Sequence, residues 1–263
     1  MTAQRYRADD GATLAYALGG DQAAAATLLF VHGWQGTSAV WEPLRSFLAG
    51  RFRTLTVDLR GMGASNGAPG PYRVERFARD LGDLVDALGL DPVVAVGHSM
   101  GGAIVQRFAV DRPEAVLGLV LIASVPASAQ TFPPALDGFF RATIADPAVA
   151  RRWVGGLTTP PQPPETTALL LGAAASASRE AAMEAYESWT TLAFGAEAAT
   201  IETPTLVIAP AGDRPMTPAL ARELVADPIA GSRFEELPAC RHYAPLDRPA
   251  AVAELIAAFV DEL

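Results

Sequence analysis

The sequence lacks lysine entirely: all 20 basic residues are arginine, against 29 acidic residues. Without a lysine amine, no Schiff base can form with a carbonyl substrate, and a pyridoxal cofactor cannot be held covalently. The formal net charge of −9 disfavours nucleic acid as a partner, because binding phosphates requires a basic face. We interpret the acidity as a source of solubility and predict no nucleic-acid partner.

Cysteine and histidine are also scarce. The single Cys240 excludes a disulfide within the chain and a cysteine-based zinc site. The three histidines, His32, His98 and His242, leave few ligands for any metal cluster. The sequence therefore predicts neither a metal nor another cofactor.

Long hydrophobic runs are missing, although 50% of the residues are hydrophobic. The longest apolar stretches have the length of strands and fall well short of the ~18 residues expected for a membrane span. The N-terminus reaches charged and turn residues before an apolar segment could form, which predicts no secretory signal. We therefore expect a soluble, cytoplasmic protein with no membrane insertion.

Apolar runs of strand length alternate with segments of helical period, which is typical of a mostly parallel sheet covered by helices. Apolar side chains recur on one helical face within residues 77–88, and again within 252–260 after Pro249. A hairpin around Gly11 is expected at the edge of the sheet. The expected strands are 27–31, 53–57, 93–96, 116–122 and 205–208. The pattern predicts an α/β fold with a mostly parallel central sheet flanked by helices.

This alternation stops between residues 128 and 199. The segment contains proline-rich punctuation and several helical patterns, so we predict a helical cap at 128–199 inserted into a core formed by residues 1–127 and 200–263. Its large apolar residues either line a pocket for a hydrophobic small-molecule substrate or pack the cap itself, and both interpretations remain open. The substrate-binding candidates in the cap are Phe132, Phe139, Trp153 and Trp189.

A serine follows the strand expected at 93–96, within the run GHSMG that matches the pattern G-x-S-x-G. Gly97 and Gly101 suit a turn too sharp for side chains at those positions. Ser99 would then lie at a helix N-terminus, where N–H groups and the helix dipole stabilise negative charge. An ordinary glycine-rich turn would show the same letters, but the strand before the motif and the helix expected after it favour a nucleophile.

A serine hydroxyl becomes an effective nucleophile when a base takes its proton and a carboxylate orients that base. His242, in a loop between an expected strand and the final helix, is the candidate base, although a surface histidine would be ordinary there. Asp213 follows the strand expected at 205–208 and is the candidate carboxylate, with a simple turn residue as the alternative.

Attack on a carbonyl also develops an oxyanion, which requires two preorganised N–H donors. Met100 follows the nucleophile and offers one backbone N–H. Trp34 offers the other, because Gly33 lets the backbone approach closely, and the Trp34 side chain would then line the pocket.

These motifs occur in the order found in the α/β-hydrolase fold superfamily, and the chain resembles its esterase, lactonase and haloperoxidase-like branch with a helical cap. The resemblance rests on HGW at 32–34, DLRGMGAS at 58–65, GHSMGG at 97–102, and the aspartate and histidine that follow. It implies the roles of a catalytic triad for Ser99, His242 and Asp213. It says much less about the substrate, because this scaffold hosts many chemistries.

Three positions depart from the family pattern. Met62 stands where members often have histidine, and we expect this to affect packing rather than mechanism. Counting back from Pro218 by the usual four residues places the acid at Arg214, whereas counting from the strand selects Asp213. Arginine has no acceptor for a histidine N–H, so chemistry favours Asp213. Arg241 occupies a position where small residues are common, and either lies on the surface or meets an acidic substrate.

The predicted function is cleavage of a carboxylic ester or lactone of a hydrophobic small molecule through an acyl-enzyme on Ser99. The alternative is a C–C hydrolase, lyase or cofactor-free oxygenase that uses the His–Asp pair, with Ser99 positioning or protonating the substrate. A non-catalytic ligand receptor is disfavoured because the sequence retains every part of the hydrolytic machinery. The sequence makes no prediction of the oligomeric state.

Overall fold

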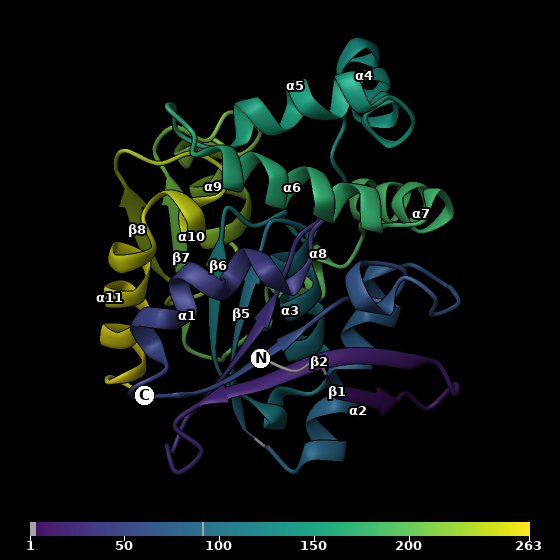
Figure 1. Ribbon diagram of the computed structural model, residues 1–263. Helices are drawn as coiled ribbons and strands as arrows, with labels where there is room; N and C mark the ends of the chain where they lie inside the picture. The colour runs from purple at the N-terminus through teal and green to yellow at the C-terminus, as the bar shows by residue number, and fades with distance from the viewer. Residues whose placement is uncertain (1–3, 91) are drawn as a thin grey trace.

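An eight-stranded sheet forms the centre of the computed structural model, which describes residues 4–90 and 92–263 (Figure 1). The strands are β1 (Gln4–Arg7), β2 (Thr13–Gly20), β3 (Thr27–Val31), β4 (Arg53–Val57), β5 (Val93–His98), β6 (Val116–Ile122), β7 (Thr205–Pro210) and β8 (Arg233–Leu237). Their order is β1-β2-β4-β3-β5-β6-β7-β8. β2 pairs antiparallel with both β1 and β4, and the remaining pairs are parallel. The predicted mostly parallel sheet and its N-terminal hairpin are therefore confirmed.

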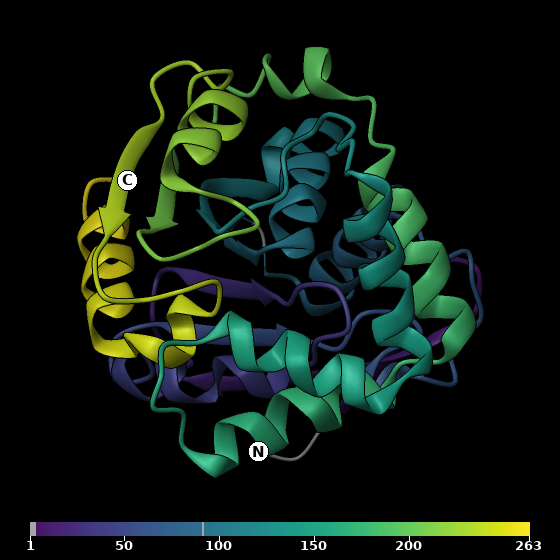
Figure 2. The same ribbon diagram turned by 90° about the horizontal axis from the view of Figure 1, so that it is seen from above.

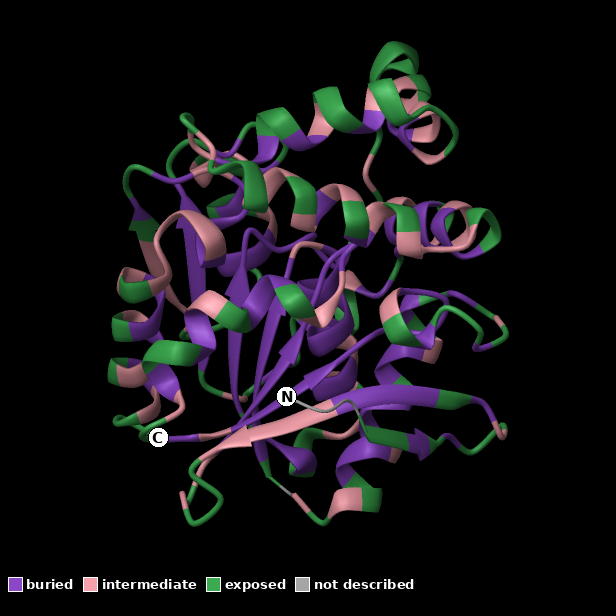
Figure 3. Ribbon diagram, viewed as in Figure 1, coloured by how far each residue is buried: buried purple, intermediate pink, exposed green. Residues whose placement is uncertain are grey.

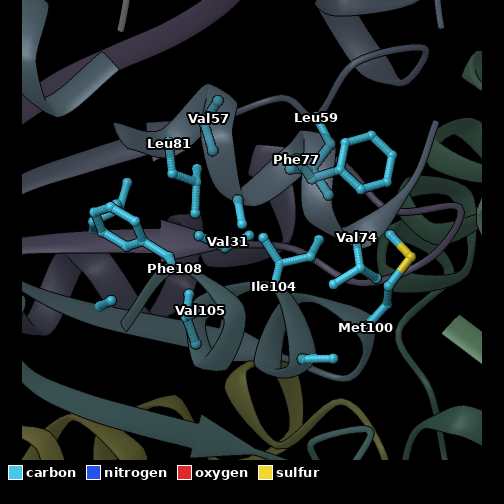
Figure 4. Packing of buried hydrophobic residues seen from close by; sticks show 14 of the residues in the cluster. Val31, Val57, Leu59, Val74, Phe77, Leu81, Met100, Ile104, Val105 and Phe108 are labelled. Carbon is cyan, nitrogen blue, oxygen red and sulfur yellow. The ribbon is translucent and has the colours of Figure 1, made fainter. Parts of the chain in front are cut away.

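Both faces of the sheet are covered by helices, because successive strand residues point to opposite faces. In β3, Leu28 and Phe30 pack in one hydrophobic cluster, whereas Leu29 and Val31 pack in the other. Helices α1 (Glu42–Leu48) and α11 (Pro249–Val260) cover the first face, and α2 (Val74–Leu88) and α3 (Met100–Asp111) cover the second. Figure 4 shows the second cluster, in which side chains of α2 and α3 meet those of β3 and β4. Figure 3 shows the central strands as almost wholly buried.

The chain between β6 and β7 forms five helices, four of which lie over one end of the sheet (Figures 1 and 2). They are α4 (Pro134–Ala145), α5 (Pro147–Leu157), α6 (Pro164–Ser176), α7 (Arg179–Thr190) and the short α8 (Gly195–Ala198). Asp146 caps α5 by accepting from the N–H groups of Ala148 and Val149, and Ser178 caps α7 by accepting from that of Ala181. We call residues 128–199 the cap and the rest the core.

Six short segments complete the described chain: η1 (Ser38–Trp41), η2 (Gly63–Ser65), η3 (Pro113–Ala115), α9 (Pro218–Ala221), η4 (Arg222–Ala226) and α10 (Ala244–Asp247). No helix in residues 4–90 and 92–263 combines the length and the apolar composition needed to cross a membrane.

Candidate active site

Ser99 lies at the corner between β5 and α3. Its backbone has φ 55° and ψ −122°, a conformation that a non-glycine residue adopts at a cost of about 1–3 kcal/mol. Two backbone hydrogen bonds hold the corner: the Ser99 N–H donates to the Ile122 carbonyl, and the Val125 N–H donates to the Ser99 carbonyl, both at 3.0 Å. The strained strand-to-helix turn leaves the serine only partly buried, with its side chain bordering a cavity.

The glycines on either side of Ser99 are required by close backbone contacts. A Cβ atom added to Gly97 would lie 2.4 Å from the Gly101 carbonyl oxygen, and one added to Gly101 would lie 2.3 Å from the Val31 carbonyl oxygen. Real Cβ atoms essentially never approach so closely. The sharp turn that places the serine therefore depends on both glycines.

His242 and Asp213 contact each other at the ends of two neighbouring strands. The Nδ1 atom of His242 lies 2.8 Å from Oδ2 of Asp213. The Asp213 side chain is 0% exposed, and its other oxygen accepts from the Met216 N–H at 3.4 Å. The neighbouring Arg214 is exposed to solvent. Counting along the sequence left Asp213 and Arg214 as candidates for the acid, and the structure places Asp213 against His242.

His98 supports the loop that carries His242. Its Nε2 atom lies 2.9 Å from the His242 carbonyl oxygen, which can only accept, so Nε2 carries the proton. Burial, followed by the charges of His242 and His32, holds the pKa of His98 well below its ordinary value. The ring is therefore a neutral donor that holds the backbone of His242.

Asp247 joins the same loop to the cap. Its carboxylate accepts from the Arg241 N–H at 2.8 Å, from the Thr159 N–H at 2.9 Å and from the Thr159 hydroxyl at 2.8 Å. The Tyr243 N–H donates to the Leu157 carbonyl at 3.0 Å. The backbone on both sides of His242 is thus held to the end of α5 and the residue pair that follows it, directly at Tyr243 and through Asp247 at Arg241.

The other departures from the family pattern have structural explanations. The Arg241 side chain reaches toward the cap, with Nη1 3.5 Å from the Thr158 carbonyl oxygen, and it does not line the cavity beside Ser99. Met62 is fully buried in the hydrophobic cluster that contains α2 and α3.

The backbone N–H groups of Trp34 and Met100 have no hydrogen-bond partner among the described residues. Met100 is the first residue of α3, whose opening N–H groups have no acceptor within the helix. Gly33 brings its chain close to the serine, because a Cβ added there would lie 2.9 Å from the Cβ of Ser99. Both donors are therefore free to bind an oxygen that develops negative charge.

His32 stabilises the turn that contains Trp34. Its Nδ1 donates to the Gly33 carbonyl at 2.8 Å, and its Nε2 accepts from the Leu59 N–H at 3.0 Å. Burial is the main cause that lowers the pKa of His32, and the charge of Asp58 opposes it. A neutral ring with its proton on Nδ1 satisfies both contacts.

Ser99 and His242 border one cavity of about 60 Å³ between the core and the cap. Among the described residues, the Ser99 hydroxyl makes no hydrogen bond to His242, a contact that is often long in enzymes without substrate. Rings from both parts of the chain surround the cavity, and the predicted residues that line it are Trp34, Phe132, Trp153 and Trp189. No arginine, aspartate or glutamate is among its described lining residues.

The sequence-based choice of Phe139 is wrong for this cavity, and its neighbour Phe140 lines it instead. Successive residues of a helix point about 100° apart, so only one of the two rings can face inward. The Phe139 ring packs against Trp153 at 5.9 Å and lies under the Arg152 guanidinium at 4.9 Å, measured to the ring centroid. Phe140 is 3% exposed, whereas Phe139 is partly exposed.

Several lining residues were not among the predicted substrate-binding residues: Ala123, Val125, Gln130, Phe140, Leu157, Pro215, Met216 and Tyr243. Phe140 could have been found from the periodicity of α4, whose buried positions are Phe140 and Thr143. The others lie in loops or at element ends, where no repeat indicates which side chain faces inward. In residues 4–90 and 92–263, no group of three or more histidine, cysteine or acidic side chains is arranged to hold a metal ion.

The chain is similar to known proteins in both sequence and structure. The model of the Alpha/beta hydrolase family matches residues 28–255. The putative non-heme bromoperoxidase BpoC of Mycobacterium tuberculosis is 28% identical over 252 residues, which cover 86% of this chain and 90% of that protein. The uncharacterized protein Mb2734 of Mycobacterium bovis is 34% identical over 97 residues, which cover 37% of this chain but only 28% of that protein.

A solved structure extends the likeness to nearly the whole molecule. A hydrolase from Pseudomonas aeruginosa PA01 superposes with a TM-score of 0.85 at 28% identity, covering 98% of each chain. The family match spans nearly all of β3, the strands from β4 to β8, the serine turn and the loops of Asp213 and His242. The chain belongs to the alpha/beta hydrolase family.

Proposed function

We propose that the protein is a serine hydrolase that cleaves a neutral carboxylic ester or lactone through an acyl-enzyme. The observation that carries the proposal is the convergence of three side chains. Ser99 at its strained turn borders the same cavity as His242, whose Nδ1 lies 2.8 Å from the buried carboxylate of Asp213. A nucleophile, a base and a group that orients the base are together sufficient for acyl transfer.

In the proposed mechanism, Ser99 Oγ attacks the carbonyl carbon while His242 Nε2 takes the hydroxyl proton. Asp213 accepts from Nδ1–H, which keeps Nε2 free to act as the base and stabilises the imidazolium that forms. The N–H groups of Trp34 and Met100 stabilise the oxyanion. The bond to the leaving oxygen then breaks, and that oxygen takes the proton from His242. A water molecule repeats the sequence, releasing the acid and restoring Ser99.

The lining of the cavity supports a neutral, apolar acyl group. No arginine, aspartate or glutamate is among its described lining residues, and most of its surface comes from aromatic and aliphatic side chains. An ionised substrate would lose its hydration there without gaining a counter-charge, which is costly. Aromatic rings instead favour alkyl or aryl groups.

Covalent labelling tests the proposal directly. We expect an alkyl fluorophosphonate to add one phosphonyl group to the wild-type protein, located on Ser99 by peptide mass spectrometry, with loss of p-nitrophenyl acetate hydrolysis. Ser99→Ala should remain folded, take up no label and lose roughly 10³ to 10⁶ of kcat. Near-wild-type turnover in that variant would overturn the acyl-enzyme. An unlabelled wild-type protein with lyase or oxygenase activity would favour the other chemistry of this fold.

A further inference from the structure

A second apolar space lies behind the wall of the catalytic cavity. This space, which we call the inner chamber, has a volume of about 10 Å³. It shares Trp34, Trp153, Leu157 and Tyr243 with the catalytic cavity. Because these four side chains line both spaces, they form the partition between them.

A groove on the cap lies next to the inner chamber. Ala150 of α5 and Ala174 of α6 line both the chamber and this groove of about 310 Å³ beside α4, α5 and α6. Both shared residues are alanines, so the side chains at the boundary between the chamber and the groove are small. Catalytic cavity, inner chamber and groove therefore follow one another from Ser99 outward.

Trp153 is one of the two tryptophans of the partition, and with Leu157 it is supplied by the cap helix α5. Its indole packs at 5.0 Å from the Phe140 ring and 5.9 Å from the Phe139 ring, measured between centroids. It is half-buried and packs against both hydrophobic clusters. Among the described residues it makes no hydrogen bond, so ring packing alone holds it in place.

The volumes indicate that the partition is closed in this structure. A space of about 10 Å³ is close to the lower limit for a single water molecule. The catalytic cavity of about 60 Å³ has room for a short acyl group. None of the described residues that line the chamber is charged, so a path beyond Trp153 would suit an alkyl chain.

We propose that the inner chamber is a latent subsite for an unbranched aliphatic acyl chain and that the Trp153 indole sets the accepted chain length by closing it. This inference rests on the proposed ester hydrolysis and names its acyl specificity. With the indole in place, the acyl chain ends at the partition. With the indole removed, the chain extends past Ala150 and Ala174 toward the groove, and each newly buried methylene raises kcat/KM roughly fourfold.

The test compares kcat/KM for p-nitrophenyl acetate and p-nitrophenyl octanoate. We expect the wild-type protein to favour acetate and Trp153→Ala to raise the octanoate-to-acetate ratio by roughly tenfold or more. Adding Ala174→Phe to Trp153→Ala refills the chamber and should return the ratio to near the wild-type value. The matched control adds Gly172→Phe instead, two residues away on α6, where an added Cβ meets no atom within 4 Å. That control should keep the raised ratio.

An unchanged ratio in Trp153→Ala, or a ratio that stays raised after Ala174→Phe, would overturn the subsite. Trp153→Leu removes the indole with less loss of apolar packing, and it should raise the ratio in the same direction if Trp153→Ala does not fold. Fluorophosphonate labelling of Ser99 accompanies every variant. If a Trp153 variant is labelled on Ser99 and hydrolyses acetate, but its octanoate-to-acetate ratio is unchanged, only the subsite is contradicted. If the wild-type protein shows neither labelling nor hydrolysis, the proposed function itself is contradicted.

Discussion

The two sides of the cavity are built by different kinds of contact. On the core side, a strained backbone, two glycines and a buried carboxylate place Ser99, Asp213 and His242. On the cap side, rings such as Phe140 and Trp153 pack against one another at centroid distances of 5–6 Å. The core side therefore tolerates little change of geometry, whereas the cap side changes the volume of the cavity whenever a ring changes size.

This difference separates chemistry from selectivity. A change on the core side alters the reacting groups and should affect all substrates alike. A change on the cap side alters the space available to the acyl group and should affect substrates according to their size. The two sides meet at the loop of His242, which is bonded to His98 in the core and, through Asp247, to Thr159 in the cap.

After the loss of Ser99 itself, the largest effect is expected on the core side, from Asp213→Asn. An asparagine of the same shape would donate to Nδ1 and favour the wrong tautomer of His242, which lowers kcat by up to ~10⁴ in serine triads. Steady-state kinetics with acetate and octanoate esters should show the same loss for both. Retention of more than about a tenth of wild-type kcat, in a protein whose Ser99→Ala variant is inactive, would show that another carboxylate or a Ser–His dyad suffices.

An intermediate effect is expected on the free energy of unfolding at low pH. It also distinguishes the core side of the cavity from the cap side. His32 and His98 are buried in the core with lowered pKa values, whereas residues 128–199 contain no histidine. The unfolded chain takes up protons on these rings below a pH of about 6.5, whereas the folded protein takes them up only at a lower pH. The free energy of unfolding should therefore fall as pH decreases, by up to about 3 kcal/mol between pH 7.5 and 5.5.

Urea unfolding at the two pH values measures this loss. His98→Gln is the matched variant, because its amide can still donate to the His242 carbonyl but does not titrate. The pH-dependent loss should shrink by about half in this variant. A free energy of unfolding that stays level in the wild-type protein, or an equal loss in His98→Gln, would contradict the assignment of buried neutral histidines.

The smallest effect is expected where the two sides meet, from Asp247→Asn. Oδ2 of Asp247 accepts from the Arg241 N–H, the Thr159 N–H and the Thr159 hydroxyl, and a neutral amide oxygen in its place would bind these donors less strongly. The amide NH2 group would then face the Thr159 N–H, which Oδ1 now accepts at 3.0 Å. We expect kcat to fall roughly tenfold for acetate and octanoate alike, because a small displacement of His242 impairs proton transfer. Thr159→Val removes only the hydroxyl contact and should cause a smaller loss. A change in the octanoate-to-acetate ratio without a change in kcat would show that Asp247 shapes the cap wall instead.

Much of the core site could be predicted because its determinants are local. The residues around Ser99 are enough to predict its sharp turn, because the end of a strand, two positions too crowded for a Cβ and the start of a helix lie within a few residues. The expected strands could also be placed, since apolar runs mark them, although β5 and β7 each continue two residues beyond the expected end. The cap wall could not be predicted in the same way, and Phe139 was chosen where Phe140 faces the cavity.

The sequence by itself determined the α/β order of elements, the sharp turn at Ser99 and the absence of any lysine or disulfide chemistry, since each follows from neighbouring residues or from composition. Only the tertiary structure decided that Asp213 meets His242, that Asp247 bonds Thr159 across 88 residues, and that Trp153 separates two cavities. These contacts join segments far apart in the chain. Their partners are chosen by how helices and strand ends pack in space, which no local pattern records.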